Sequence, residues 1–106
     1  MSTSTLLEHP HHLEAERAVL GAILVDNAQM DAALAAHLTA DQFFRDVHQR
    51  VFRALVTLAE RRSALDFVTV RIELERTGDL EEVGPAYLAS LIDGGMRGVN
   101  LPHYLA

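Results

Sequence analysis

The chain has 106 residues, a formal net charge of −6 and 49% hydrophobic residues, which indicates one globular domain and excludes a disordered chain. It contains no cysteine, and all nine of its basic residues are arginine. Disulfides, thiolate chemistry, a Gly-x-x-x-x-Gly-Lys phosphate loop and a Schiff-base lysine are therefore excluded.

Residues 1–12 predict a flexible lead-in, without the basic and apolar regions of a signal peptide. Its histidines, His9, His11 and His12, could hold a metal, but one cluster without a second ligand set is typical of a solvated tail. No later run reaches the ~20 apolar residues that a membrane span needs. We expect no metal site, no membrane partner and a cytoplasmic protein.

The first helix is predicted from Leu13 to about Val25. Its first turn is acidic, as the helix dipole favours, and an eight-residue apolar run follows before Asp26 and Asn27 end the helix. Gly21 lies within this run, where glycine weakens a helix, so we expect a neighbouring element to approach closely there.

A second helix is predicted to begin after Asp26, with Gln29 completing a capping box. Apolar residues then recur at helical spacing up to Leu38. A Thr-x-x-Gln sequence at 39–42 predicts a short turn before Phe43 and Phe44, and we expect both aromatic rings in the core, with a ligand pocket as the alternative.

Residues 46–62 have the clearest helical periodicity, with Val47, Val51, Leu55 and Leu58 in one stripe. Residues 45–62 carry five arginines against two acids, a local charge of +3. The candidate basic face comprises Arg50, Arg53 and Arg61. Such a face can meet nucleic acid or an acidic partner, although a solvated face is the usual meaning.

The histidines of the helical region, His37 and His48, are isolated in the sequence. His48 is expected at the edge of the amphipathic helix, where a structural hydrogen bond is favoured over proton transfer.

Residues 68–75 alternate between apolar and polar, which is typical of a strand. A lone strand would leave its backbone groups unpaired, and the chain has no second alternating run. We therefore predict a helix, with Asp66 as N-cap, an Arg71–Glu75 pair and Gly78 at the left-handed C-terminal position.

A short turn at 80–83 and a helix that opens at Gly84-Pro85 follow, and Asn100 begins a further helix that the sequence stops within. An acidic cluster could bind a divalent cation, although such runs are usually hydrated; it comprises Glu73, Glu75, Asp79, Glu81 and Glu82. The chain is thus predicted to be an all-α, compact bundle of about five to six short helices, without catalytic, cofactor-binding or metal residues.

Four stretches, in this order, resemble the N-terminal domain of the bacterial replicative DNA helicase of the DnaB type. They are His12 to Asp26, Phe43 to Arg61, Leu65 to Arg76, and Ala86 to Leu91 followed by Asn100 to Tyr104. The departures are modest: Asp46, for example, stands where the family commonly has proline.

The resemblance implies a flexible segment at 1–12, a helical collar domain at 13–99 and the start of a following helix at 100–106. It implies a non-catalytic part of a hexameric helicase in which these domains form a trimer of dimers and dock primase, while the hexamer engages DNA. ATP and Mg²⁺ would belong to a separate RecA-like motor domain. Leu101, Tyr104 and Leu105 would be the root of the hairpin at the main dimer interface. The alternative function is a small helical DNA-binding module that uses the basic face.

Overall fold

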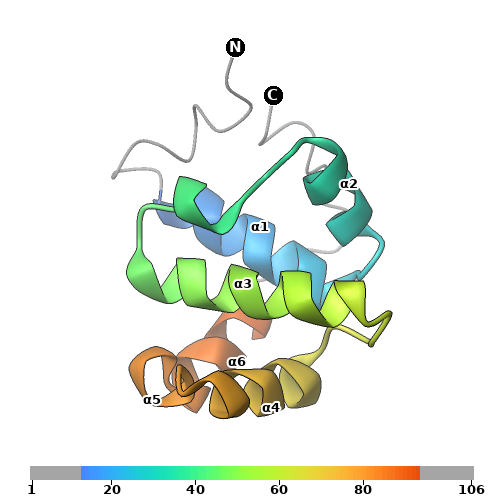
Figure 1. The fold of residues 1–106 in the computed structure, drawn as a ribbon. Helices are drawn as coiled ribbons and strands as arrows, with labels where there is room; N and C mark the ends of the chain where they lie inside the picture. The colour runs from blue at the N-terminus through green and yellow to red at the C-terminus, as the bar shows by residue number, and fades with distance from the viewer. Residues whose placement is uncertain (1–12, 94–106) are drawn as a thin grey trace.

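The computed structural model describes residues 13–93, which form six α-helices and one 3-10 helix (Figure 1). In chain order they are α1 (Leu13–Val25), α2 (Gln29–Ala35), η2 (Ala40–Gln42), α3 (Asp46–Glu60), α4 (Phe67–Thr77), α5 (Leu80–Val83) and α6 (Pro85–Asp93). The described part has no β-strand, so the predicted all-α bundle of short helices is confirmed. The predicted divisions after residues 12 and 99 stay predictions.

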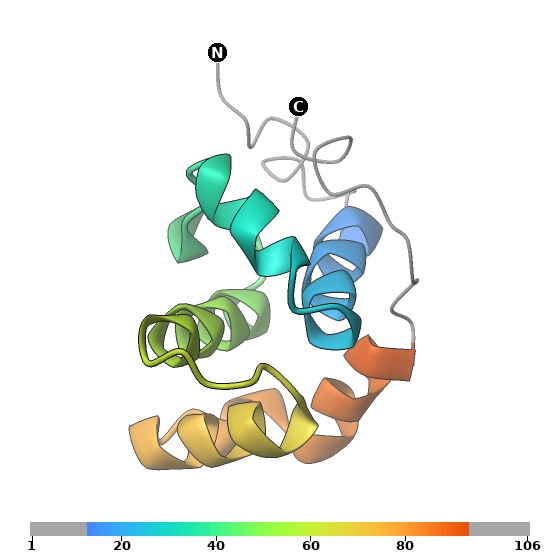
Figure 2. The ribbon, with the colours of Figure 1, turned by 90° about the vertical axis from the view of Figure 1, so that its right-hand side faces the viewer.

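Helix α3 runs through the middle of the bundle, with α2 and η2 on one side and α4 and α5 on the other (Figures 1 and 2). Helix α1 packs against α3 and also against α6, which closes the remaining side. Both α1 and α3 therefore supply the centre of the core, and their fully buried apolar residues are Val19, Leu20, Ile23, Val51, Phe52 and Leu55.

Residues 67–77 form helix α4, so the predicted helix is confirmed although residues 68–75 alternate as a strand would. The Asp66 carboxylate accepts the Thr69 N–H at 2.9 Å, and the Thr69 hydroxyl accepts the Asp66 N–H at 3.0 Å. At the other end Gly78 has φ +81°, the left-handed cap predicted for it. The predicted Arg71–Glu75 ion pair is absent from the ion pairs of residues 13–93.

The alternation along α4 arises because two i,i+4 pairs lie on opposite faces of the helix. Val70 and Leu74 are fully buried, whereas Val68 and Ile72 are more than half exposed. A period of two between 68 and 74 is thus produced by a helix that is apolar on both its inner and its outer face.

The connection between α1 and α2 differs from the predicted capping box. The Asp26 carboxylate accepts the Ala28 N–H at 3.2 Å and the Gln29 side-chain amide at 3.3 Å, so it closes a turn ahead of the helix rather than capping it. Asn27 next to it holds the bundle together: its side chain donates to the Leu65 carbonyl at 2.7 Å and accepts the Leu65 N–H at 2.9 Å.

The neighbouring residues Phe43 and Phe44 differ in burial. Gln42 accepts the Thr39 N–H at 2.9 Å across the short 3-10 turn, as its sequence predicts. Phe43 is then buried against Phe52, with 5.2 Å between ring centroids, but Phe44 is 55% exposed. The prediction that both rings enter the core is wrong for Phe44, because consecutive residues in the extended segment after η2 point to opposite sides.

Candidate functional site

The main polar feature of the domain is a buried chain of hydrogen bonds that joins α1, α3 and α6. The carboxylate of Glu16 on α1 lies 2.6 Å from Nδ1 of His48 on α3. Nε2 of His48 lies 2.7 Å from the hydroxyl of Tyr87 on α6. The side chains of Glu16 and His48 are both 0% exposed. Three helices are therefore connected through one imidazole ring.

Glu16 also accepts hydrogen bonds from the backbone that leads into α3. The Phe44 N–H donates to Oε2 at 2.6 Å, and the Arg45 N–H donates to Oε1 at 3.4 Å. Arg45 is the N-cap of α3 and offers no side-chain cap of its own. The carboxylate of α1 thus takes up N–H groups at the positive end of the α3 dipole.

The hydrogen-bond directions in this network follow from the charge state of His48. Burial lowers the pKa of His48 below its usual 6.5, although the hydrogen bond to Glu16 opposes this shift. A neutral ring donates its Nδ1 hydrogen to the Glu16 carboxylate and accepts the Tyr87 hydroxyl hydrogen at Nε2. Each buried side-chain nitrogen or oxygen among residues 13–93 has a hydrogen-bond partner.

Two arginines cover the outer end of the network. The guanidinium carbons of Arg17 and Arg45 lie 5.2 Å and 5.4 Å from the centroid of the Tyr87 ring, within the range of cation–π contacts. Arg45 also donates to the Tyr87 hydroxyl at 3.4 Å, and Arg17 to the Ser90 carbonyl at 3.5 Å. The carboxylate–imidazole–hydroxyl order is that of an acid–base relay, but its acid and base are sealed from solvent, so its role is structural.

Sequence reasoning missed this network. The predicted place of Glu16 in an acidic first turn is confirmed, but its burial was not expected. The predicted place of His48 at a helix edge is wrong because the side chain is fully buried, although its predicted structural hydrogen bond is confirmed. A signal was present, since Glu16 precedes Val19, Leu20 and Ile23 at the i+3, i+4 and i+7 spacing of a buried face.

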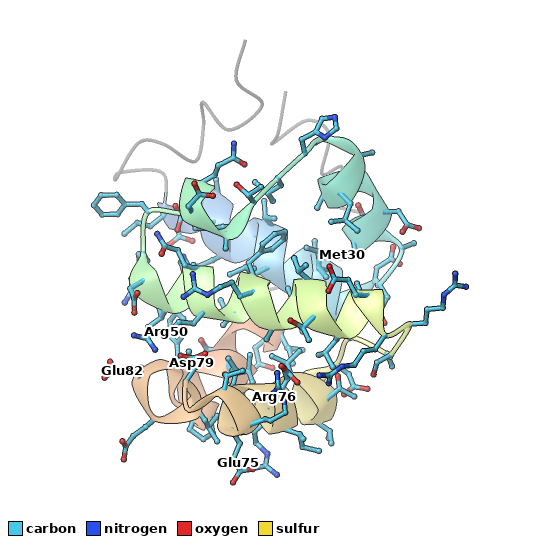
Figure 3. The ribbon with its side chains drawn as sticks, viewed as in Figure 1. Met30, Arg50, Glu75, Arg76, Asp79 and Glu82 are labelled. Carbon is cyan, nitrogen blue, oxygen red and sulfur yellow. The ribbon has the colours of Figure 1, made fainter. Side chains whose placement is uncertain are left out.

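The candidate basic face is largely neutralised by carboxylates. Arg50 is paired with Asp46 one turn earlier and with Asp79 at the start of α5, and its side chain points toward Asp79 in Figure 3. Arg61 donates to Glu73 at 3.2 Å. Arg53 takes part in none of the ion pairs found in residues 13–93.

The acidic cluster is only partly hydrated. Glu73 is buried beneath Arg76, which donates to it at 2.6 Å and holds the pKa of Glu73 below its usual value. Asp79 accepts from Arg50 and from the Thr77 hydroxyl. Neither carboxylate is free for a cation, and residues 13–93 contain no cluster of three or more side chains of the metal-binding types.

An apolar groove lies between α2, η2 and α3, with a volume of about 450 Å³. Leu34, Leu38, Ala40 and Val56 form its walls, and Arg53 lies at its rim. On the other side of Arg53 a polar hollow of about 280 Å³ opens toward Glu73 and Asp79. The predicted interface residues Leu101, Tyr104 and Leu105 and the histidines at 9–12 lie outside the described residues.

The family model of the DnaB-like helicase N-terminal domain matches residues 8–106. The chain belongs to this family. The DnaB replicative helicase of Treponema pallidum is 41% identical over 96 residues, and that of Geobacillus stearothermophilus is 38% identical over the same length. The chain is also similar to the crystal structure of the DnaB N-terminal domain from Mycobacterium tuberculosis, with a TM-score of 0.81 and 35% sequence identity. This match covers 88% of this chain and 65% of the Mycobacterium chain.

The matches to whole DnaB helicases involve only part of those proteins. Each alignment covers 90% of this chain but 22% of the Treponema and 21% of the Geobacillus helicase. The chain thus spans about a fifth of these relatives. No helix in the described region is long and apolar enough to cross a membrane.

Proposed function

We propose that this DnaB-type N-terminal domain is a non-catalytic assembly and docking module of a hexameric, ATP-dependent replicative helicase. In this role it supports the helicase ring as part of a collar, a trimer of dimers, and docks primase. The similarity to the Mycobacterium DnaB N-terminal domain over 88% of the chain carries the proposal. ATP and Mg²⁺ then act in a motor domain beyond this sequence, because a chain without lysine cannot form the phosphate loop.

The chemistry of the described residues supports a role in binding rather than in catalysis. The Glu16–His48 pair is sealed in the core, where it connects helices instead of meeting a substrate. Arg50 and Arg61 are already paired with acids, and the chain has a net charge of −6. A duplex-binding module would instead expose a connected set of unpaired cations.

Association can be tested by sedimentation equilibrium. The chain is compared with a version extended by about 40 residues of its natural sequence, enough for a two-helix hairpin with Leu101, Tyr104 and Leu105 at its root. We expect the extension to strengthen self-association. Substitution of the three apolar root residues by serine in the extended protein should reverse the gain, and equal association with and without the extension would contradict the assembly role.

Docking can be tested by gel filtration of the extended protein with the primase of the same organism. Co-elution supports the docking role, and separate elution at concentrations up to about 100 µM contradicts it. Binding to duplex DNA tests the alternative function. Tight, steeply salt-dependent binding that Arg50→Glu with Arg53→Glu abolishes would favour the DNA-binding module.

A further inference from the structure

The groove between α2, η2 and α3 combines an apolar lining with one arginine. It is lined by aliphatic side chains, and Leu34 on its wall remains 44% exposed although it belongs to a residue type that usually packs inside. A volume of about 450 Å³ accommodates several aliphatic side chains. Two short helical elements and α3 border it, which is the form of a helix-binding groove.

Arg53 gives this groove its chemical specificity. It projects from α3 at the boundary between the apolar groove and the polar hollow. The carboxylates in that hollow are already used, because Glu73 accepts from Arg61 and Arg76 and Asp79 accepts from Arg50. Arg53 is exposed and forms no ion pair within residues 13–93, so its guanidinium stands beside an aliphatic surface without a carboxylate from that part of the chain.

We propose that this groove docks an amphipathic helix of a partner protein, whose apolar stripe is flanked by a carboxylate. Two or three aliphatic side chains of the helix enter the groove, and the carboxylate pairs with Arg53 at its rim. The inference deepens the docking role proposed above and rests on it. It differs from that role in assigning a particular groove and the chemistry of the segment that fills it.

A second copy of this chain is a poorer occupant. The outer face of α4, with Val68 and Ile72, is the exposed apolar stripe that the described residues offer. Arg71 lies three residues after Val68 and Glu75 three residues after Ile72, so α4 carries one charge of each sign beside this stripe. Seated in the groove, α4 would offer Arg53 a like charge as well as a carboxylate, which complements Arg53 less well than a helix flanked by carboxylates alone.

The probe is a fluorescein-labelled synthetic helix of about 18 residues, long enough to be partly helical in water. Leucines at i, i+4 and i+7 form its stripe, glutamates flank the stripe, and a matched peptide has lysines in their place. Fluorescence anisotropy with the 106-residue chain should give a Kd of about 10–300 µM for the acidic peptide and at least ~3-fold weaker binding for the basic one. Equal affinities would overturn the proposal.

Three variants locate the site. Leu34→Glu should weaken binding at least ~10-fold, because it places a charge in the apolar wall. Arg53→Glu should reverse the preference, so that the lysine peptide binds better. Val68→Glu makes the same chemical change at an exposed apolar residue on the opposite side of α3 and should leave binding unchanged. Binding that is unaffected by Leu34→Glu or Arg53→Glu would overturn the assignment.

Two further measurements keep the result interpretable. Amide chemical shifts of the wild-type chain, which do not depend on any variant folding, should change at Leu34, Leu38 and Val56 when the acidic peptide is added; changes confined to other helices would refute the site. A peptide of residues 66–78 tests the second copy, and tighter binding of this peptide than of the acidic probe would overturn the choice of occupant. Primase that co-elutes while the acidic peptide fails to bind would refute the groove but leave the docking role standing.

Discussion

Replacement of Glu16 by glutamine gives the sharpest test of the buried network. Glutamine keeps the shape of the side chain but has one acceptor oxygen and one donor nitrogen. In the native domain one carboxylate oxygen accepts the Phe44 N–H and the other accepts from His48, both at 2.6 Å. In the variant, the amide oxygen of Gln accepts the Phe44 N–H, and the amide nitrogen then faces Nδ1 of His48. The His48 ring must therefore take its other tautomer, in which Nδ1 accepts and Nε2 donates to the Tyr87 hydroxyl.

The expected cost follows from the change in acceptor. Hydrogen bonds to a charged group contribute about 1.5–3 kcal/mol and neutral ones about 0.5–1.5 kcal/mol. In this variant two buried hydrogen bonds lose their charged acceptor. We therefore expect Glu16→Gln to lower the free energy of unfolding by about 2–3 kcal/mol. Glu16→Ala leaves the same donors without any acceptor and should cost about 3–5 kcal/mol. Against a total stability of about 5–15 kcal/mol, either change is easily measured.

Urea unfolding followed by far-UV circular dichroism measures both variants, with m-values to check that the transition stays two-state. Glu14→Gln is the matched control, because Glu14 lies in the same first turn but is exposed. It should change stability by less than about 0.5 kcal/mol. If Glu16→Gln changes the free energy of unfolding as little as Glu14→Gln, the carboxylate does not hold the helices together and the reasoning is refuted.

Tyr87→Phe keeps the ring between the arginines but leaves the buried Nε2 of His48 without a donor and removes the acceptor of the 3.4 Å bond from Arg45, so urea unfolding should show a loss of about 1–3 kcal/mol; a loss below ~0.5 kcal/mol would contradict a role of this hydroxyl in the network. Because burial lowers the pKa of His48, the unfolded chain takes up its proton first, so stability should be full above pH 6.5 and fall as the pH drops below it. Urea unfolding across this range should show a weaker fall in His48→Gln than in His37→Gln, and equal falls would exclude His48 as the source. Gly84 has φ +82° and ψ +131°, whereas Gly78 has φ +81° and ψ +12°, so thermal unfolding should show a larger loss for Gly84→Ala than for Gly78→Ala; the reverse order would refute this. Asp46→Pro should be neutral or stabilising by up to about 1 kcal/mol in urea, since Asp46 is the first residue of α3, whereas Gln49→Pro removes the hydrogen bond from the Gln49 N–H to the Arg45 carbonyl and should cost about 3 kcal/mol.

Much of the fold could be predicted from the sequence because most helices carry their own start and stop signals. Asp66 and Gly78 at the two ends of α4 indicated a helix against a strand-like alternation, and the structure confirms them. The wrong predictions concern residues whose surroundings are set by distant parts of the chain. The extended backbone after η2 sends Phe43 and Phe44 to opposite sides, and the contact of Phe43 with Phe52, which no local pattern specifies, decides which of the two rings is buried.

The buried network shows the same limit more clearly. Glu16 and His48 are separated by 32 residues, and Tyr87 lies 39 residues beyond His48. Taken alone, each residue fits an ordinary structural role: Glu16 is an acid in a first turn, His48 is a polar residue on a helix, and Tyr87 is an aromatic residue beside the core. Periodicity indicates which face of α1 is buried, but it does not indicate that the partner of its carboxylate lies on α3.

The position of Glu16 connects this network to the start of α3. Helix α3 begins at Asp46 without a side-chain cap from its own N-cap residue. The carboxylate of α1 accepts the two N–H groups just before that helix, and the same carboxylate fixes His48 in its first turn. Asp46 adds a second negative charge there and pairs with Arg50. A proline at the first helical position would preset the backbone, since its missing N–H is not needed there. This chain uses acids from two helices instead, so the docking of α1 stabilises the start of α3.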